Sequence, residues 1–121
     1  MDKLKVFFDL DGVICSDTKG KYQNSKPNKE LIAYLNLLHD KGHEISIYTS
    51  RYMGRLNEDV FSVNEFGFEK ITSQLKDWGV KYNRLILGKP RYDIFIDDKA
   101  YHYHSDQSLE ELKQRVSELE K

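Results

Sequence analysis

"VFFDLDGVIC", residues 6–15, is the stretch that decides how this chain folds. It opens with apolar and aromatic side chains typical of a buried strand, yet Asp9 and Asp11 follow at once. A carboxylate at the edge of a core needs a hydrogen-bonding partner, water or a cation. The stretch therefore predicts a strand, residues 4–8, that ends in a functional pair of acids.

Strand and helix patterns alternate along the rest of the chain, which is typical of an α/β fold with a parallel sheet. The predicted strands are residues 4–8, 44–50, 84–88 and 92–98. The predicted helices are residues 27–42, residues 68–79 with Phe68, Ile71, Leu75 and Trp78 on one face, and a last helix within 105–121. We expect a Rossmann-like three-layer sandwich. Residues 52–66 show no clear pattern.

The composition is that of one globular domain, residues 1–121. Its 19 basic and 20 acidic residues leave a net charge of −1, so nothing in the total indicates a nucleic-acid partner. Cys15 is the single cysteine, which excludes an internal disulfide and favours a reducing compartment. The start of the chain has no apolar run that predicts a signal peptide or a membrane partner. We therefore expect a cytoplasmic protein.

Polar side chains follow all four predicted strands at their carboxyl ends, where open parallel sheets bind ligands. In chain order they are Asp9 and Asp11, then Thr49, Ser50 and Arg51, then Lys89, and last Asp97 and Asp98. Any one of them alone fits a helix cap or a solvated turn. Four strands that bring polar groups to one edge indicate a site.

The chemistry that suits these groups is phosphoryl transfer. Carboxylates gathered at short range need a cation, because like charges raise one another's pKa. A set of oxygen ligands without Cys or His favours Mg²⁺ over zinc. Hydroxyls and backbone amides at Thr49 and Ser50 would hold phosphoryl oxygens, and Lys89 would offset their charge.

These residues resemble the four motifs of the haloacid dehalogenase superfamily of phosphotransferases. "DLDGV" is similar to its first motif, "IYTS" to its hydroxyl motif, the lysine of "LGKP" to its lysine motif, and "IDD" to its acidic motif, in the family's order over residues 4–98. "DLDGVIC", "GKYQNSKPN", "TSRYM" and "GKPRYDIFIDDKA" further resemble the small bacterial capsule-biosynthesis phosphatases.

The resemblance implies a phosphatase in which Asp9 is the nucleophile and forms a phospho-aspartate. Asp11 would protonate the leaving oxygen and then activate water. Mg²⁺ would be held by the Asp9 carboxylate, the Asp11 backbone carbonyl and the Asp98 carboxylate, with Asp97 reached through water. Whether Asp97 or Asp98 binds the metal directly stays open.

The gaps between the motifs leave no room for a cap domain, so we expect an open site. Only a hairpin over residues 15–26 would cover it, and its Tyr22 would touch the substrate. Arg51 would either grip an anionic part of the substrate or make a surface ion pair. We expect a bulky substrate or a homo-oligomer in which a neighbouring subunit covers the pocket.

The substrate implied is a small phosphorylated sugar, sugar acid or polyol used in capsular or surface polysaccharide synthesis. Alternatives are a nucleic-acid end-processing phosphatase and a non-enzymatic phosphate-binding domain. A receiver domain fits less well, because no aspartate follows the strand at 84–88. We expect Cys15 to be a packed thiol, and His102 and His104 to lie on a solvated strand face or beside the substrate.

Overall fold

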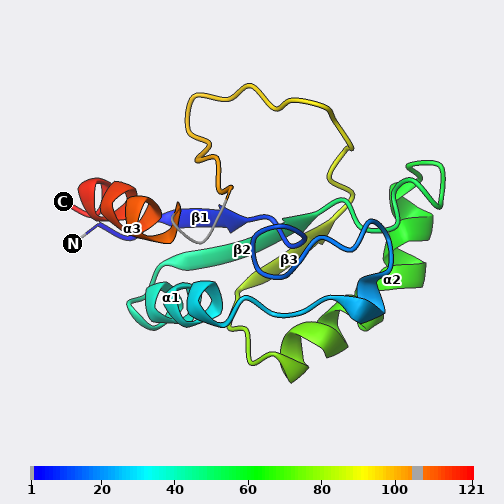
Figure 1. Ribbon diagram of the computed structural model, residues 1–121, viewed down its shortest axis with the longest axis horizontal. Helices are drawn as coiled ribbons and strands as arrows, with labels where there is room; N and C mark the ends of the chain where they lie inside the picture. Colours follow the sequence, from blue (N-terminus) through cyan, green and yellow to red (C-terminus); the bar gives the residue numbers. More distant parts are fainter. Residues whose placement is uncertain (1, 105–107) are drawn as a thin grey trace.

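The computed structural model describes residues 2–104 and 108–121. In this part of the chain three strands form one parallel sheet in the order β1-β2-β3 (Figure 1). They are β1, Lys5–Phe8, β2, Glu44–Thr49, and β3, Arg84–Leu87. Phe8 pairs with Ile47, and Thr49 with Leu87, so the carboxyl ends of the three strands meet at one edge.

Three α-helices flank this sheet within the described ranges: α1, Lys29–Asp40, α2, Val60–Asp77, and α3, Ser108–Leu119. The Asn28 side chain caps α1 by accepting a hydrogen bond from the Leu31 amide. Along the central strand β2, Ile45–Ile47 are buried without a break, as in a sheet covered on both faces. The predicted Rossmann-like α/β fold without a cap is confirmed for the described residues. None of their helices is both long and apolar enough to cross a membrane.

Helix α2 begins earlier than the sequence predicted, at Val60 rather than at residue 68. Asp59 caps it by accepting hydrogen bonds from the Phe61 amide and the Ser62 hydroxyl. The predicted buried face was partly wrong, because Phe68 is 41% exposed. The residues of α2 that are buried are Val63, Gly67, Ile71 and Leu75.

The predicted fourth strand, residues 92–98, does not form. This segment lies in a loop that arcs away from the sheet (Figure 1). Ile94, Phe95 and Ile96 are 75%, 54% and 89% exposed. Residues of high β-propensity form a strand only where a neighbouring strand pairs with them, and no ladder joins this segment to β1 or β3 in the described chain. β1 is thus an open edge of the sheet.

Helix α3 lies beside the amino-terminal end of β1, close to both chain ends (Figure 1). The Glu120 carboxylate, just after it, accepts hydrogen bonds from Lys41 Nζ at 3.0 Å and His43 Nε2 at 2.6 Å. His43 Nδ1 accepts from the Leu4 amide, so its proton lies on Nε2 and points at Glu120. The hydrogen bond from His43, followed by that from Lys41, lowers the pKa of Glu120.

We expect Glu120→Gln to destabilise the protein by about 1 kcal/mol at neutral pH, the scale of a hydrogen bond to a charged group with partial exposure. A carboxyl whose pKa is lowered by folding stabilises above its usual value of 4.5, and this contribution fades as the pH falls through the folded-state pKa. Urea unfolding at neutral and acid pH measures the difference. The exposed Glu118→Gln is the control, and an equal loss at both pH values would contradict the assignment.

Candidate functional site

Asp9 stands directly after β1, with its side chain 38% exposed. Its Oδ1 accepts a hydrogen bond from the Leu10 amide at 2.8 Å, and Lys89 Nζ lies 3.8 Å from the same oxygen. Burial raises the pKa of Asp9 above its usual 3.8, and Lys89 and the Leu10 amide oppose this rise. Asp9 is therefore an accessible carboxyl group beside one cation.

Lys89 reaches this position from the end of β3. Its backbone amide donates to the Thr49 carbonyl at 3.1 Å, which extends the pairing of β2 and β3 by one bond. Its ammonium lies 5.8 Å from the Tyr48 ring centre and 5.3 Å from that of Tyr92, distances at which a cation is attracted to an aromatic ring. Lys89 is thus held at the sheet edge next to Asp9.

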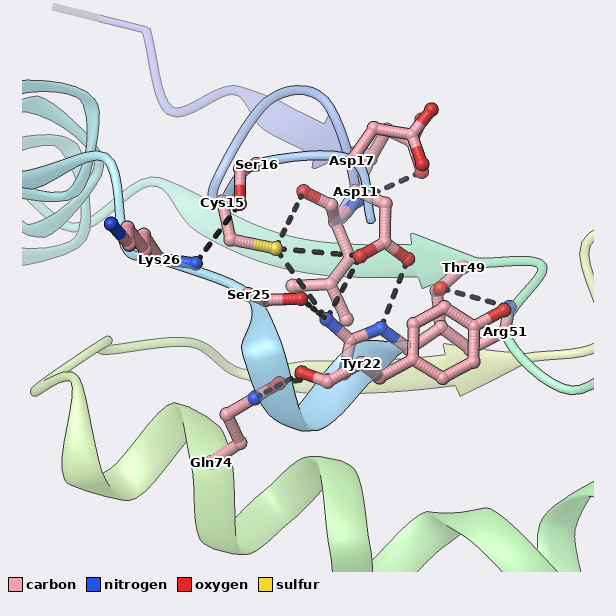
Figure 2. Close-up of polar contacts among 12 residues, drawn as sticks. Asp11, Cys15, Ser16, Asp17, Tyr22, Ser25, Lys26, Thr49, Arg51 and Gln74 are labelled. Atoms are coloured by element: carbon pink, nitrogen blue, oxygen red, sulfur yellow. Dashed lines mark hydrogen bonds and ion pairs between the residues drawn. The ribbon is translucent and has the colours of Figure 1, made fainter. Parts of the chain in front are cut away.

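Asp11 is held by Arg51 rather than by solvent. Arg51 Nε and Nη2 donate to the two Asp11 oxygens at 2.9 Å each (Figure 2). Arg51 Nη1 donates to Gln74 Oε1 at 2.6 Å, and the Tyr22 ring centre lies 4.5 Å from the guanidinium carbon. Because the Arg51 side chain is only 2% exposed, the ion pair is a buried clamp and not the surface pair considered above.

Thr49 and Ser50 shape the turn after β2. Thr49 Oγ1 accepts from the Arg51 amide at 3.1 Å, and the Ser50 carbonyl accepts from the Met53 amide. Within the described residues the Thr49 hydroxyl donates to no acceptor, and Thr49 is buried at 1% exposure. The structure therefore brings six predicted residues to one edge of the sheet: Asp9, Asp11, Thr49, Ser50, Arg51 and Lys89.

The predicted hairpin, residues 15–26, is a loop closed by a bridge between Cys15 and Pro27, with a short 3-10 helix, η1, at Tyr22–Asn24. Cys15 lies at the base of this hairpin, and its Sγ donates to the Leu10 carbonyl at 3.6 Å. It is 2% exposed, and burial followed by the nearby Asp11 charge raises the pKa of its thiol to about 12. A thiol that stays protonated is a poor nucleophile. His102 and His104 lie with their rings 5.4 Å apart and are exposed.

The acids do not form a metal site in this arrangement. Asp97 and Asp98 lie in the exposed loop and do not join Asp9 and the Asp11 backbone carbonyl at the sheet edge. Among residues 2–104 and 108–121 no group of three His, Cys, Asp or Glu side chains is placed to hold a metal ion. The predicted magnesium ligands therefore do not fit that ion as they stand.

Comparison with known proteins supports the fold and leaves the family open. No protein-family model matches the chain, and no curated protein matches it. The structure resembles the crystal structure of a structural-genomics target from Vibrio cholerae, with a TM-score of 0.76 and 28% sequence identity. The match covers 93% of this chain and 98% of that one. The description of that protein states no activity.

Sequence reasoning missed Gln74, which joins the two sides of the clamp. Its Oε1 accepts from Arg51, and its Nε2 donates to the Tyr22 carbonyl at 2.9 Å. Gln74 follows Ile71 by three residues and precedes the buried Leu75. A polar side chain next to a buried helical stripe was the available signal.

Separate substitution of Asp9 and of Asp11 should distinguish a structural carboxyl group from an accessible one. We expect Asp11→Asn to lose about 3 kcal/mol of stability, because it leaves the buried Arg51 guanidinium without its counter-charge. Asp9→Asn should leave the free energy of unfolding unchanged or raise it slightly, since burial of its charge is unfavourable. Urea unfolding of both variants measures this, and equal losses would show that the clamp does not stabilise the fold.

Proposed function

We propose that this chain is a phosphomonoesterase of the haloacid dehalogenase type, which acts through a phospho-aspartate on Asp9. The observation that carries the proposal is the accessible Asp9 carboxyl group with Lys89 Nζ 3.8 Å away, at the edge where the strands end. The motifs in the family's order support it further. The substrate proposed is a phosphorylated sugar, sugar acid or polyol of capsular or surface polysaccharide synthesis.

In the proposed reaction an Asp9 oxygen attacks phosphorus, the bond to the leaving oxygen breaks, and water then hydrolyses the acyl phosphate to release inorganic phosphate. Lys89 and the Thr49 hydroxyl would bind the phosphoryl oxygens, whose charge is the main demand on such a site. Asp11 would donate the proton to the leaving oxygen. Because both Asp11 oxygens accept hydrogen bonds from Arg51, this role requires the clamp to loosen when substrate binds.

Magnesium is the cofactor that the resemblance implies and the one we propose, although its predicted ligands are not gathered at the sheet edge among the described residues. The proposed compartment is the cytoplasm, because the one cysteine is buried and unpaired. A bulky substrate or a neighbouring subunit would cover the open edge.

A second candidate is a phosphate-binding domain without turnover. It is favoured by one observation, that both Asp11 carboxylate oxygens accept hydrogen bonds from Arg51 and are not free to act on a substrate. Turnover distinguishes the two candidates.

The test is phosphate release from a panel of sugar, sugar-acid, polyol and nucleotide monophosphates and an oligonucleotide with a terminal phosphate, with Mg²⁺ or with chelator. We expect release from a carbohydrate phosphate, lost in Asp9→Asn. Lys89→Met should lower kcat/KM roughly a hundredfold, as for one oxyanion-stabilising donor. The exposed Lys76→Met on α2 should have no effect.

Turnover that survives Asp9→Asn would contradict the phospho-aspartate. Preference for the oligonucleotide would replace the carbohydrate assignment with nucleic-acid end processing. Phosphate binding without any turnover would favour the binding domain.

A further inference from the structure

A second cleft lies beside the clamp, between the hairpin, the turn after β2 and helix α2. Its volume is about 390 Å³, within the usual range for small-molecule sites. Arg51 and Gln74, which form the clamp with Asp11, also line this cleft. The cleft therefore shares two residues with the clamp.

Three aromatic rings make the wall of the cleft. The Tyr22 and Tyr52 rings are 5.0 Å apart, as are those of Tyr52 and Phe66, and both pairs meet edge to face. Tyr52 adopts φ of 68°, a strained value for a bulky side chain. Its ring also fills the space above Gly67, where an added Cβ would lie 2.4 Å from it. The wall is thus fixed by packing.

Two further cations lie across this wall. Arg55 Cζ is 5.6 Å from the Tyr52 ring centre and 5.7 Å from that of Phe66, and Lys70 Nζ is 5.0 Å from Phe66. No carboxylate of the described residues lines the cleft. Neither Arg55 nor Lys70 forms an ion pair with any residue in 2–104 or 108–121. Both cations therefore lie beside the aromatic wall in exposed positions, with no ion-paired partner among the described residues.

We propose that this cleft binds a second anionic group of the substrate, separate from the phosphate that is cleaved. The inference rests on the proposed function and narrows its substrate class to phosphorylated carbohydrates with another oxyanion, a carboxylate or a further phosphate. Arg55 presents a planar fork that matches either group, and Lys70 adds a point charge. The carbohydrate backbone would lie along the rings of Tyr22 and Tyr52.

Matched substrates test the proposal. Phosphogluconate and glucitol phosphate, both esterified at the terminal hydroxyl, differ by the carboxylate, and glucose bisphosphate and glucose monophosphate differ by the second phosphate. In at least one pair, we expect the wild type to prefer the compound with the second anionic group over the compound that has only the phosphate. In the double variant Arg55→Gln with Lys70→Gln, the ratio of the two kcat/KM values should fall about tenfold, mainly through KM, which corresponds to the loss of one charge-assisted contact.

Two controls make the readout specific. Lys76→Gln removes a positive charge from an exposed position of the same helix outside the cleft and should leave the ratio unchanged. When Lys replaces Arg55 in place of Gln in the double variant, the charge is kept without the planar fork, and part of the preference for the second anionic group should return. The cleft does not bind a second anion if the double variant leaves both kcat/KM ratios unchanged. The same holds if it lowers turnover equally for substrates with and without the second anionic group.

A binding measurement separates this proposal from the proposed function. Titration calorimetry with phosphogluconate and with glucose bisphosphate uses the Asp9→Asn protein, with and without the Arg55 and Lys70 substitutions. If the wild type releases no phosphate from either pair, yet one of these compounds binds and the double substitution weakens that binding about tenfold, the proposed function fails and the cleft assignment stands. Undetectable binding of both, or binding that the double substitution leaves intact, overturns the cleft assignment.

Discussion

The ion pair of Asp11 and Arg51 is the interaction on which the arrangement of the site depends. It joins the loop after β1 to the turn after β2, and Gln74 extends it to helix α2 and to the hairpin through the Tyr22 carbonyl. A buried pair of this kind contributes little net stability relative to well-packed apolar residues, but loss of one partner is costly. The ion pair with its Gln74 contacts therefore fixes the relative positions of four segments: the loop after β1, the turn after β2, helix α2 and the hairpin.

The same geometry divides the two acids of the first motif. Asp9 keeps its carboxyl group partly exposed with a single cation nearby, whereas both oxygens of Asp11 are engaged. Residues two apart in the chain thus have opposite environments, which is how two carboxyl groups can take different roles at one site. The parallel register accounts for the positions of the other site residues, because it places the turn after β2 and the loop after β3 at the same edge of the sheet.

Sequence periodicity predicted the three observed strands, the α/β class and six of the residues that meet at the sheet edge, because each property depends on local pattern and strand direction. It failed for residues 92–98, whose alternating apolar side chains are typical of a strand but find no partner strand. It also failed for residues 52–66, where Tyr52 in a left-handed conformation and the Asp59 cap have no periodic signature. Partners such as Gln74, distant in sequence, cannot be recognised from spacing alone.

Arg51 also gives the two proposals a common physical basis. The Arg51 side chain is 2% exposed, and its guanidinium donates to Asp11 and lies 4.5 Å from the centre of the Tyr22 ring, so an anion bound in the cleft would act on it through space rather than by direct contact. Attraction between Arg51 and a ligand oxyanion is strong in a site with little water, and it would weaken the hold of Arg51 on Asp11. A substrate with a second anionic group would thereby favour release of the Asp11 carboxyl group for proton transfer. A substrate with only the phosphate would lack this effect. Binding of the second anion and release of the Asp11 carboxyl group would therefore be coupled through Arg51.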